Sequence, residues 1–307
     1  MFKNLMIYRL PKAWAMSVEA LSLLLAGQAF QPCTSAELQR MGWVPPREGG
    51  ALVHTANRQL LLRLRVEKKL LPASVIKEAA KARADELEEL QGFRPGRKAM
   101  RELKEIVADE LLPRAFGVLS NTWVWIDPVN GWLVVDTPSV SRADDAIKLL
   151  LKAVVRLPLE SLRVKQTPVA SMTGWLDADE APRGFTIDQD AEMASAGASN
   201  AKVRYVKHTL EAADIRRHIA AGKQCTRVGL TWRNKISFVL TETLAIKSVR
   251  QLDVLREGEA GMQDSDERFD NDFMLMSGET AQLLADLVGA LGGEVDDLAS
   301  AAMRHAA

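Results

Sequence analysis

Residues 122–136, TWVWIDPVNGWLVVD, are the stretch that decides the fold class of this chain. Two runs rich in β-branched and aromatic residues flank the turn sequence PVNG at 128–131, whose glycine can adopt a positive φ angle. The stretch therefore predicts an antiparallel hairpin. Trp123 and Trp125 stand two residues apart and share one face of the first strand. We expect these tryptophans to pack in the core rather than to stack on bases.

Strand patterns recur on both sides of this hairpin. They are found at residues 2–10, 60–67, 202–208, 226–232 and 235–240. Val228, Leu230 and Trp232 alternate as one buried face requires, and Arg233-Asn234 predicts the turn of a second hairpin.

Helical patterns alternate with these strands. Helices are expected at residues 18–29 after the N-cap Ser17, from Ser141 with Asp144 three residues later, at 211–221 and at 280–291. Residues 41–46 (MGWVPP) read as a turn, residues 167–200 as short helices and loops with a loop at 196–200, and residues 257–272 as a surface loop or short helix. The mixture predicts an α+β fold with mixed antiparallel sheets.

Two further helices between residues 74 and 112 predict an antiparallel helical hairpin that protrudes from the body. Ser74 can cap the first helix and Gly92 ends it. Pro95 can open the second helix, and Pro113 stops it. We divide the chain into a 1–73 N-terminal part of the body, this 74–112 finger, a 113–200 central part and a 201–307 C-terminal part.

The tip of this predicted finger carries three cations beside an aromatic residue, namely Arg94, Arg97 and Lys98 next to Phe93. Cations on a protruding turn are suited to contact with a phosphate backbone. The alternative interpretation is an ordinary solvated turn.

The net charge of the chain is zero, with 40 Lys and Arg against 40 Asp and Glu, but the charges are unevenly distributed. Residues 202–235 hold nine Lys or Arg and two acids, a net charge of +7. Residues 251–307 hold thirteen acids and three arginines, a net charge of −10. The first segment can face phosphate while the second repels it. The alternative is that each run covers a solvated face.

Compartment and membrane association follow from the apolar runs and the cysteines. No apolar run reaches the roughly 18 residues that a membrane span requires, and the N-terminus shows no secretory pattern. Cys33 and Cys225 provide neither a disulfide framework nor a metal cluster. We expect a protein of the reducing cytosol without membrane contact.

A search for enzymatic motifs finds no phosphate-binding loop, no dinucleotide fingerprint and no metal-ligand spacing among the four histidines. We therefore expect no cofactor and no enzymatic activity. Four acids, Asp264, Asp266, Asp270 and Asp272, could suggest a divalent metal, but they lack the glycine and glutamate of a calcium loop. A metal-dependent nuclease that uses this cluster at 264–272 remains an alternative.

Several short segments occur together and in order along nearly the whole chain. They are FKNLM (2–6), MGWVPP (41–46), LLPRAF (111–116), WID (125–127) with VNG (129–131), GK (222–223), and FDNDF (269–273) followed by MSGE (276–279). No single segment is specific, but their ordered combination resembles the RdgC family of recombination-associated proteins.

This resemblance implies properties that the residue patterns alone do not give. RdgC proteins are α+β and form ring-shaped homodimers around a basic central hole that is wide enough for duplex DNA. They bind double-stranded and single-stranded DNA with little sequence preference and oppose RecA by occupying its DNA. The family is implied to be non-enzymatic, cytoplasmic and nucleoid-associated. The alternatives are the nuclease above and a protein-interaction scaffold without DNA contact.

The resemblance also implies roles for individual residues. Phe116 of the LLPRAF segment corresponds to the family's dimer-contact position, with packing inside the subunit as the alternative. Lys207 and His208 match a DNA-binding Lys-Gln pair, but histidine replaces glutamine here. Histidine can still donate to phosphate, with a charge that depends on pH. The other expected DNA contacts are Lys202, Arg204, Arg114 and the finger cations Arg94, Arg97 and Lys98. The acidic C-terminal stretch is expected on the outside of the ring.

Overall fold

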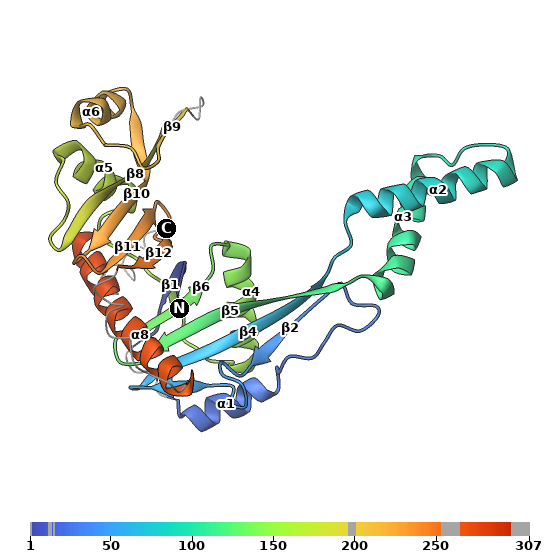
Figure 1. Ribbon diagram of the computed structural model, residues 1–307, viewed down its shortest axis with the longest axis horizontal. Coiled ribbons are helices and arrows are strands. Elements are labelled where there is room, and N and C mark those ends of the chain that lie inside the picture. Colours follow the sequence, from blue (N-terminus) through green and yellow to red (C-terminus); the bar gives the residue numbers. More distant parts are fainter. Residues whose placement is uncertain (1, 12–13, 15, 196–200, 253–264, 296–307) are drawn as a thin grey trace, which may run out of the picture.

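The computed structural model describes residues 2–11, 14, 16–195, 201–252 and 265–295 (Figure 1). Its strands are β1 (Leu5–Arg9), β2 (Gln39–Val44), β3 (His54–Ala56), β4 (Gln59–Lys69), β5 (Gly117–Asp127), β6 (Trp132–Asp136), β7 (Glu160–Ser161), β8 (Phe185–Ser195), β9 (Lys202–Tyr205), β10 (Lys223–Trp232), β11 (Ile236–Thr241) and β12 (Ile246–Gln251). Its helices are α1 (Val18–Ala26), α2 (Ala73–Gln91), α3 (Arg97–Leu111), α4 (Val140–Ala153), α5 (Pro168–Ala178), α6 (Ala212–Ala220) and α8 (Ser265–Ala290), with a 3₁₀ turn, η1 (Leu112–Arg114).

One continuous sheet joins all of these strands in place of the separate sheets that we expected. Its order is β2-β4-β5-β6-β1-β12-β11-β10-β8-β9, with β3 beside β4 and β7 beside β1. Every strand pair is antiparallel. The strand β1 connects the two halves, since Leu5 is paired with Asp136 of β6 on one side and with Ile246 of β12 on the other.

The predicted β5–β6 hairpin is confirmed and lies at the centre of the core. Gly131 in its turn has a φ angle of 73°, as the turn requires. Trp125 is fully buried, as expected, and its indole Nε1–H donates a hydrogen bond of 2.8 Å to Gln59 Oε1. This bond satisfies the polar end of a large apolar side chain.

Helices cover different faces of the two halves of the sheet. Leu21 of α1 and Leu150 of α4 pack against Leu62 and neighbouring apolar residues on one face of the β4–β6 half. Helices α5, α6 and α8 pack on the opposite face, chiefly over the β8–β12 half, where Trp232 and Phe273 are buried. The other face of β8–β12 is therefore open in the described part of the chain. None of the described helices is long and apolar enough to cross a membrane.

The α2–α3 arm, residues 73–111, projects from the sheet where β4 ends and β5 begins (Figure 1). Both predicted helices are confirmed, and an ion pair of 3.2 Å between Arg83 and Glu110 links them. Gly92 ends α2 with a φ angle of 78°, as expected. Ser74 does not cap α2, because the helix already begins at Ala73 and Pro72 occupies the N-cap position.

Several boundaries in the body differ from the sequence-based predictions. The turn expected at 41–46 is largely strand β2, and Gly42 permits this because a Cβ atom there would lie 2.3 Å from Phe30 Cα. Ser139 caps α4 in place of Ser141, since its side chain accepts from the N–H of Arg142. The cap Ser17 of α1 is confirmed.

The segment 167–195 holds longer elements than we expected, since it forms helix α5 and the eleven-residue strand β8. Helix α8 is also longer than expected and includes the described part of the acidic segment, residues 265–272. The loop expected at 196–200, Asp264 and the tail beyond Asp297 lie outside the described residues.

Candidate nucleic-acid interface

The open face of β8–β12 carries a group of cations from three strands, which we call the basic face. Its members are Lys202 and Arg204 of β9, Arg227 of β10, and Lys247 and Arg250 of β12. Strand alternation places them there, because Val228, Leu230 and Trp232 turn the opposite way into the core. At about 4.8 Å per strand, the four intervals from β9 to β12 span about 19 Å.

A shallow depression of about 320 Å³ lies in the middle of this face. Arg204, Lys207, Arg227, Lys247 and Arg250 all contribute to its lining. Within the described part of the chain, none of these five cations forms an ion pair, so each can accept an external anion. Lys202 differs, since its Nζ lies 3.6 Å from Glu192 Oε1.

Three carboxylates of β8 interrupt the basic face, namely Asp188, Asp190 and Glu192. Each accepts a hydrogen bond from a protein group. Asp188 accepts hydrogen bonds of 2.9 and 3.0 Å from the Thr231 hydroxyl, and Glu192 accepts one from Thr226. Burial, together with the neighbouring charge of Asp190, raises the pKa of Asp188 against the effect of the Thr231 bond. Partial burial acts to raise the pKa of Glu192, but the Thr226 bond, Arg227 and Lys202 lower it overall.

Lys207 and His208 lie in the turn that follows β9, beyond the end of the strand that we predicted to reach 208. Both side chains are exposed. The φ angle of Lys207 is 50°, in the left-handed region. The His208 ring lies 5.9 Å from that of Tyr205, and its Nδ1 is 2.8 Å from the Thr209 carbonyl oxygen. The turn is therefore contiguous with the depression, since Lys207 lines it.

The cations of the α2–α3 arm lie well apart from the basic face of the same chain (Figure 1). Arg94 is within 3.7 Å of Asp85 and 3.8 Å of Glu88, so its charge is partly offset inside the arm. Arg97 and Lys98 are exposed in the first turn of α3, and Arg114 is exposed in η1 at the base of the arm. The sequence-predicted DNA contacts thus fall into two groups that one subunit does not bring together.

Phe116 stands at the base of the arm, and its side chain is 84% exposed. This exposure excludes the alternative of packing inside the subunit. Leu70 lies opposite Phe116 and Val118 follows it on the same face of the β4–β5 ribbon; both are also exposed. Leu70, Phe116 and Val118 together form an exposed apolar patch, which we call the Phe116 patch.

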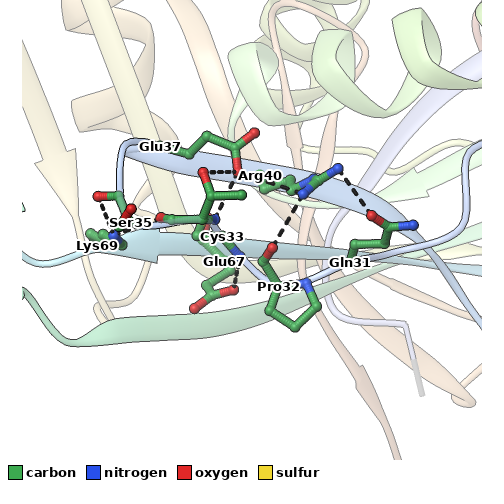
Figure 2. A network of polar contacts seen from close by, with 9 residues as sticks. Gln31, Pro32, Cys33, Ser35, Glu37, Arg40, Glu67 and Lys69 are labelled. Atoms are coloured by element: carbon green, nitrogen blue, oxygen red, sulfur yellow. Dashed lines mark hydrogen bonds and ion pairs between the residues drawn. The ribbon is translucent and has the colours of Figure 1, made fainter. Parts of the chain in front are cut away.

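A polar network holds residues 31–37 against the other face of this ribbon (Figure 2). The N–H of Cys33 donates to Glu67 Oε2 at 2.7 Å, and Lys69 Nζ donates to the carbonyl oxygens of Thr34 and Ser35. Lys69 is only 7% exposed, so these two bonds compensate the burial of its charge. Burial, with the nearby Glu67 charge, also raises the pKa of the Cys33 thiol. The network fixes the ribbon that presents the Phe116 patch.

Comparisons with known proteins identify the family. Residues 1–294 match the family model described as "Putative exonuclease, RdgC". The chain belongs to the RdgC family. It is 61% identical over 296 residues to the recombination-associated protein RdgC of Janthinobacterium sp. (strain Marseille), covering 96% of this chain and 99% of that protein. It is also 55% identical over 294 residues to the RdgC protein of Bordetella pertussis, covering 95% and 98%.

The word exonuclease in the RdgC family description directs attention to the acidic residues of α8. Asp270 lies 3.1 Å from His54 Nε2 and 3.6 Å from Arg47, and Asp266 lies 3.7 Å from the same arginine. These two carboxylates therefore tie α8 to the β3 side of the sheet. Among the described residues, no group of three or more His, Cys, Asp or Glu is arranged to hold a metal ion.

Sequence reasoning missed three cations of the basic face. Arg227 belongs to the +7 segment, and its alternation with Val228 could have placed it opposite the core. Lys247 and Arg250 lie outside that segment in a strand that the sequence analysis did not assign. The pairing of β12 with β11 places both residues on the basic face, since Lys247 is paired with Val239 and Arg250 with Ser237.

Proposed function

We propose that this RdgC-family protein binds duplex DNA without sequence preference through the basic face. The observation that carries the proposal is the set of five depression-lining cations without an ion pair in the described chain. Such cations displace counterions from the phosphate backbone and need no contact with base edges. Single-stranded DNA presents the same phosphates, so it is expected to bind as well.

We also propose that two subunits close into a ring around the duplex. A ring needs two contacts per subunit, and the protein has two features suited to them. The Phe116 patch is apolar, exposed and carried by the β4–β5 ribbon, and the α2–α3 arm reaches far from the body. In such a ring the arm cations of one subunit can reach the DNA held by the basic face of the other.

Bound in this way, the protein would limit recombination by occupying the DNA on which RecA assembles. This role agrees with the name of the relatives, recombination-associated protein, which states no more than the process. We therefore expect the protein to act in the cytoplasm, on the nucleoid, without an enzymatic step or a cofactor.

Equilibrium binding to two labelled duplexes of unrelated sequence tests the proposal. We expect equal affinities and a linear fall of log K with log salt, with a slope of about −0.9 for each phosphate contact. Absence of binding at about 50 mM salt, where non-specific binding is strong, would instead favour a protein-interaction scaffold.

A metal-dependent exonuclease is the second candidate, because the RdgC family description names one. The ion pairs of Asp266 and Asp270 with Arg47 argue against a metal site on that part of α8. Incubation of linear duplex and supercoiled plasmid with magnesium or manganese decides between the candidates, since intact DNA in both lanes rejects the nuclease.

A further inference from the structure

Strand β8 contains a bulge next to the turn that carries Lys207. Ala191 of β8 is paired with Val228 of β10, whereas Ile187 is paired with Leu230. Between these pairs β8 has the three residues 188–190, and β10 has only Gly229. Bulges of this kind change the direction of side chains and often lie beside functional sites.

Gly229 allows the bulge to approach β10 closely. A Cβ atom at Gly229 would lie 3.2 Å from the Cβ atoms of both Asp188 and Asp190, and 3.3 Å from the Asp190 carbonyl oxygen. Any larger residue would therefore press on the bulge. The glycine at position 229 therefore leaves room for the two aspartates, which turn toward the open face.

The bulge supplies two hydrogen bonds to the turn after β9. Asp190 Oδ1 accepts a bond of 3.1 Å from the backbone N–H of Lys207, and the Gln189 carbonyl accepts one of 3.1 Å from the N–H of His208. The left-handed backbone of Lys207 is strained for a residue other than glycine. These bonds compensate that strain and hold the turn in one conformation.

From this geometry we propose that Asp190 is a positioning residue that orients Lys207 and His208 toward a DNA phosphate. The inference rests on the proposed DNA-binding function. It explains why an acid occupies a face that would bind a polyanion: the carboxylate repels phosphate, but it also fixes the backbone of the lysine that contacts phosphate. Asp188 has a different partner, since Thr231 occupies its carboxylate.

The two roles of Asp190 can be separated by two neutral variants. Asp190→Asn removes the charge and keeps an Oδ1 acceptor, whereas Asp190→Ala removes both. We expect Asp190→Ala to weaken duplex binding about threefold to tenfold, the range of one lost hydrogen bond. Its salt slope should fall by roughly one. Asp190→Asn should bind at least as tightly as the unmodified protein, with the full slope. Asp190→Val, which suits a strand, replaces the alanine variant if that variant unfolds.

Asp188→Ala is the matched control, because Asp188 lies two residues away in the same bulge and its carboxylate accepts hydrogen bonds from Thr231, not from the turn. It should bind DNA as tightly as the unmodified protein or more tightly. Adding Asp190→Ala to the double variant Lys207→Ala/His208→Ala should cause no further loss, since both positioned side chains are already absent.

The outcomes also separate this inference from the function on which it rests. Unmodified protein that does not bind duplex DNA overturns both. Binding by the unmodified protein, with Asp190→Ala and Asp190→Asn equal to each other in affinity and slope, overturns the positioning role and leaves the DNA-binding proposal in place.

Discussion

Leu70 and Phe116 form the last rung of the β4–β5 ribbon, through a backbone hydrogen bond of 2.8 Å from the Leu70 N–H to the Phe116 carbonyl oxygen. Their side chains are 57% and 84% exposed. Full burial of a phenylalanine side chain contributes about 1.5–3 kcal/mol, so a partner that covers this rung gains substantial free energy. The pair lies where the arm meets the ribbon, and it belongs to the proposed contact between subunits.

Phe116→Ser should therefore weaken self-association by about tenfold or more, because the burial of an aromatic side chain is lost from the contact. Light scattering or sedimentation over a range of protein concentrations measures the change. Leu23→Ser is the matched control, since Leu23 of α1 is 78% exposed and lies outside the Phe116 patch. Equal dimerisation of Phe116→Ser and the unmodified protein would reject Phe116 as a dimer contact.

Gly117→Ala should destabilise the ribbon by about 1 kcal/mol, a typical cost for a destabilising substitution. Its Cβ atom would lie 2.2 Å from Glu67 Oε1 and would displace the carboxylate that accepts from Cys33. Urea unfolding measures the effect. Gly278→Ala in α8 meets no atom within 4 Å and should instead stabilise the protein by up to about 1 kcal/mol. Shifts of the same sign in both variants would contradict the proposed steric cause.

His54 should make the stability dependent on pH. Burial lowers the pKa of its imidazole, and Arg47 adds to this effect against the opposing charge of Asp270. The unfolded chain then takes up a proton more readily, near the ordinary value of about 6.5. The contribution of His54 is therefore complete above that value and is lost as the pH falls through it toward the lowered folded-state pKa.

Thermal unfolding of the unmodified protein and of His54→Phe at about pH 5.5 and pH 7.5 tests this expectation. Phenylalanine suits the site because the His54 ring lies 5.1 Å from Phe269 and 5.7 Å from Phe273. The unmodified protein should lose more stability on acidification than the variant. An identical loss in both proteins would show that His54 is not responsible.

A closed ring should also discriminate between DNA topologies. Linear duplex offers ends over which a ring can pass, whereas covalently closed circular duplex of the same sequence offers none. We expect stable binding to the linear form and reduced binding to the circle, as measured by gel shift with the native mass recorded in parallel. Equal binding to both forms would mean that the ring opens readily or that no ring forms.

The sequence predicted best where the signals are local. The β5–β6 hairpin depends on a turn at 128–131 and on alternation within a few residues, and both are readable without tertiary contacts. Strand β2 was missed because its Gly42 has meaning only beside Phe30, which lies in a different segment. Strand β8 was missed because the bulge at 188–190 breaks the alternation on which strand recognition depends.

The candidate site was predictable only in part, because the pairing of distant strands assembles the rest of it. Lys202 and Arg204 stand in a conspicuously basic segment, but Lys247 and Arg250 join them only through the pairing of β11 with β12. In the sequence alone, nothing distinguishes Asp190 from the other acidic residues. Its bond to the Lys207 N–H depends on a register shift between strands that no pattern in the sequence indicates.

The salt dependence of duplex binding by Arg204→Ala/Arg250→Ala tests the DNA-binding role of the basic face most directly. Both arginines line the depression without an ion pair in the described chain, so their loss should lower the affinity and reduce the salt slope by about two. Arg58→Ala/Arg183→Ala, which removes the same charge from two exposed residues outside the basic face, should bind nearly as the unmodified protein does. An unchanged slope for the first variant, or an equal reduction in both, would contradict the assignment of DNA binding to this face.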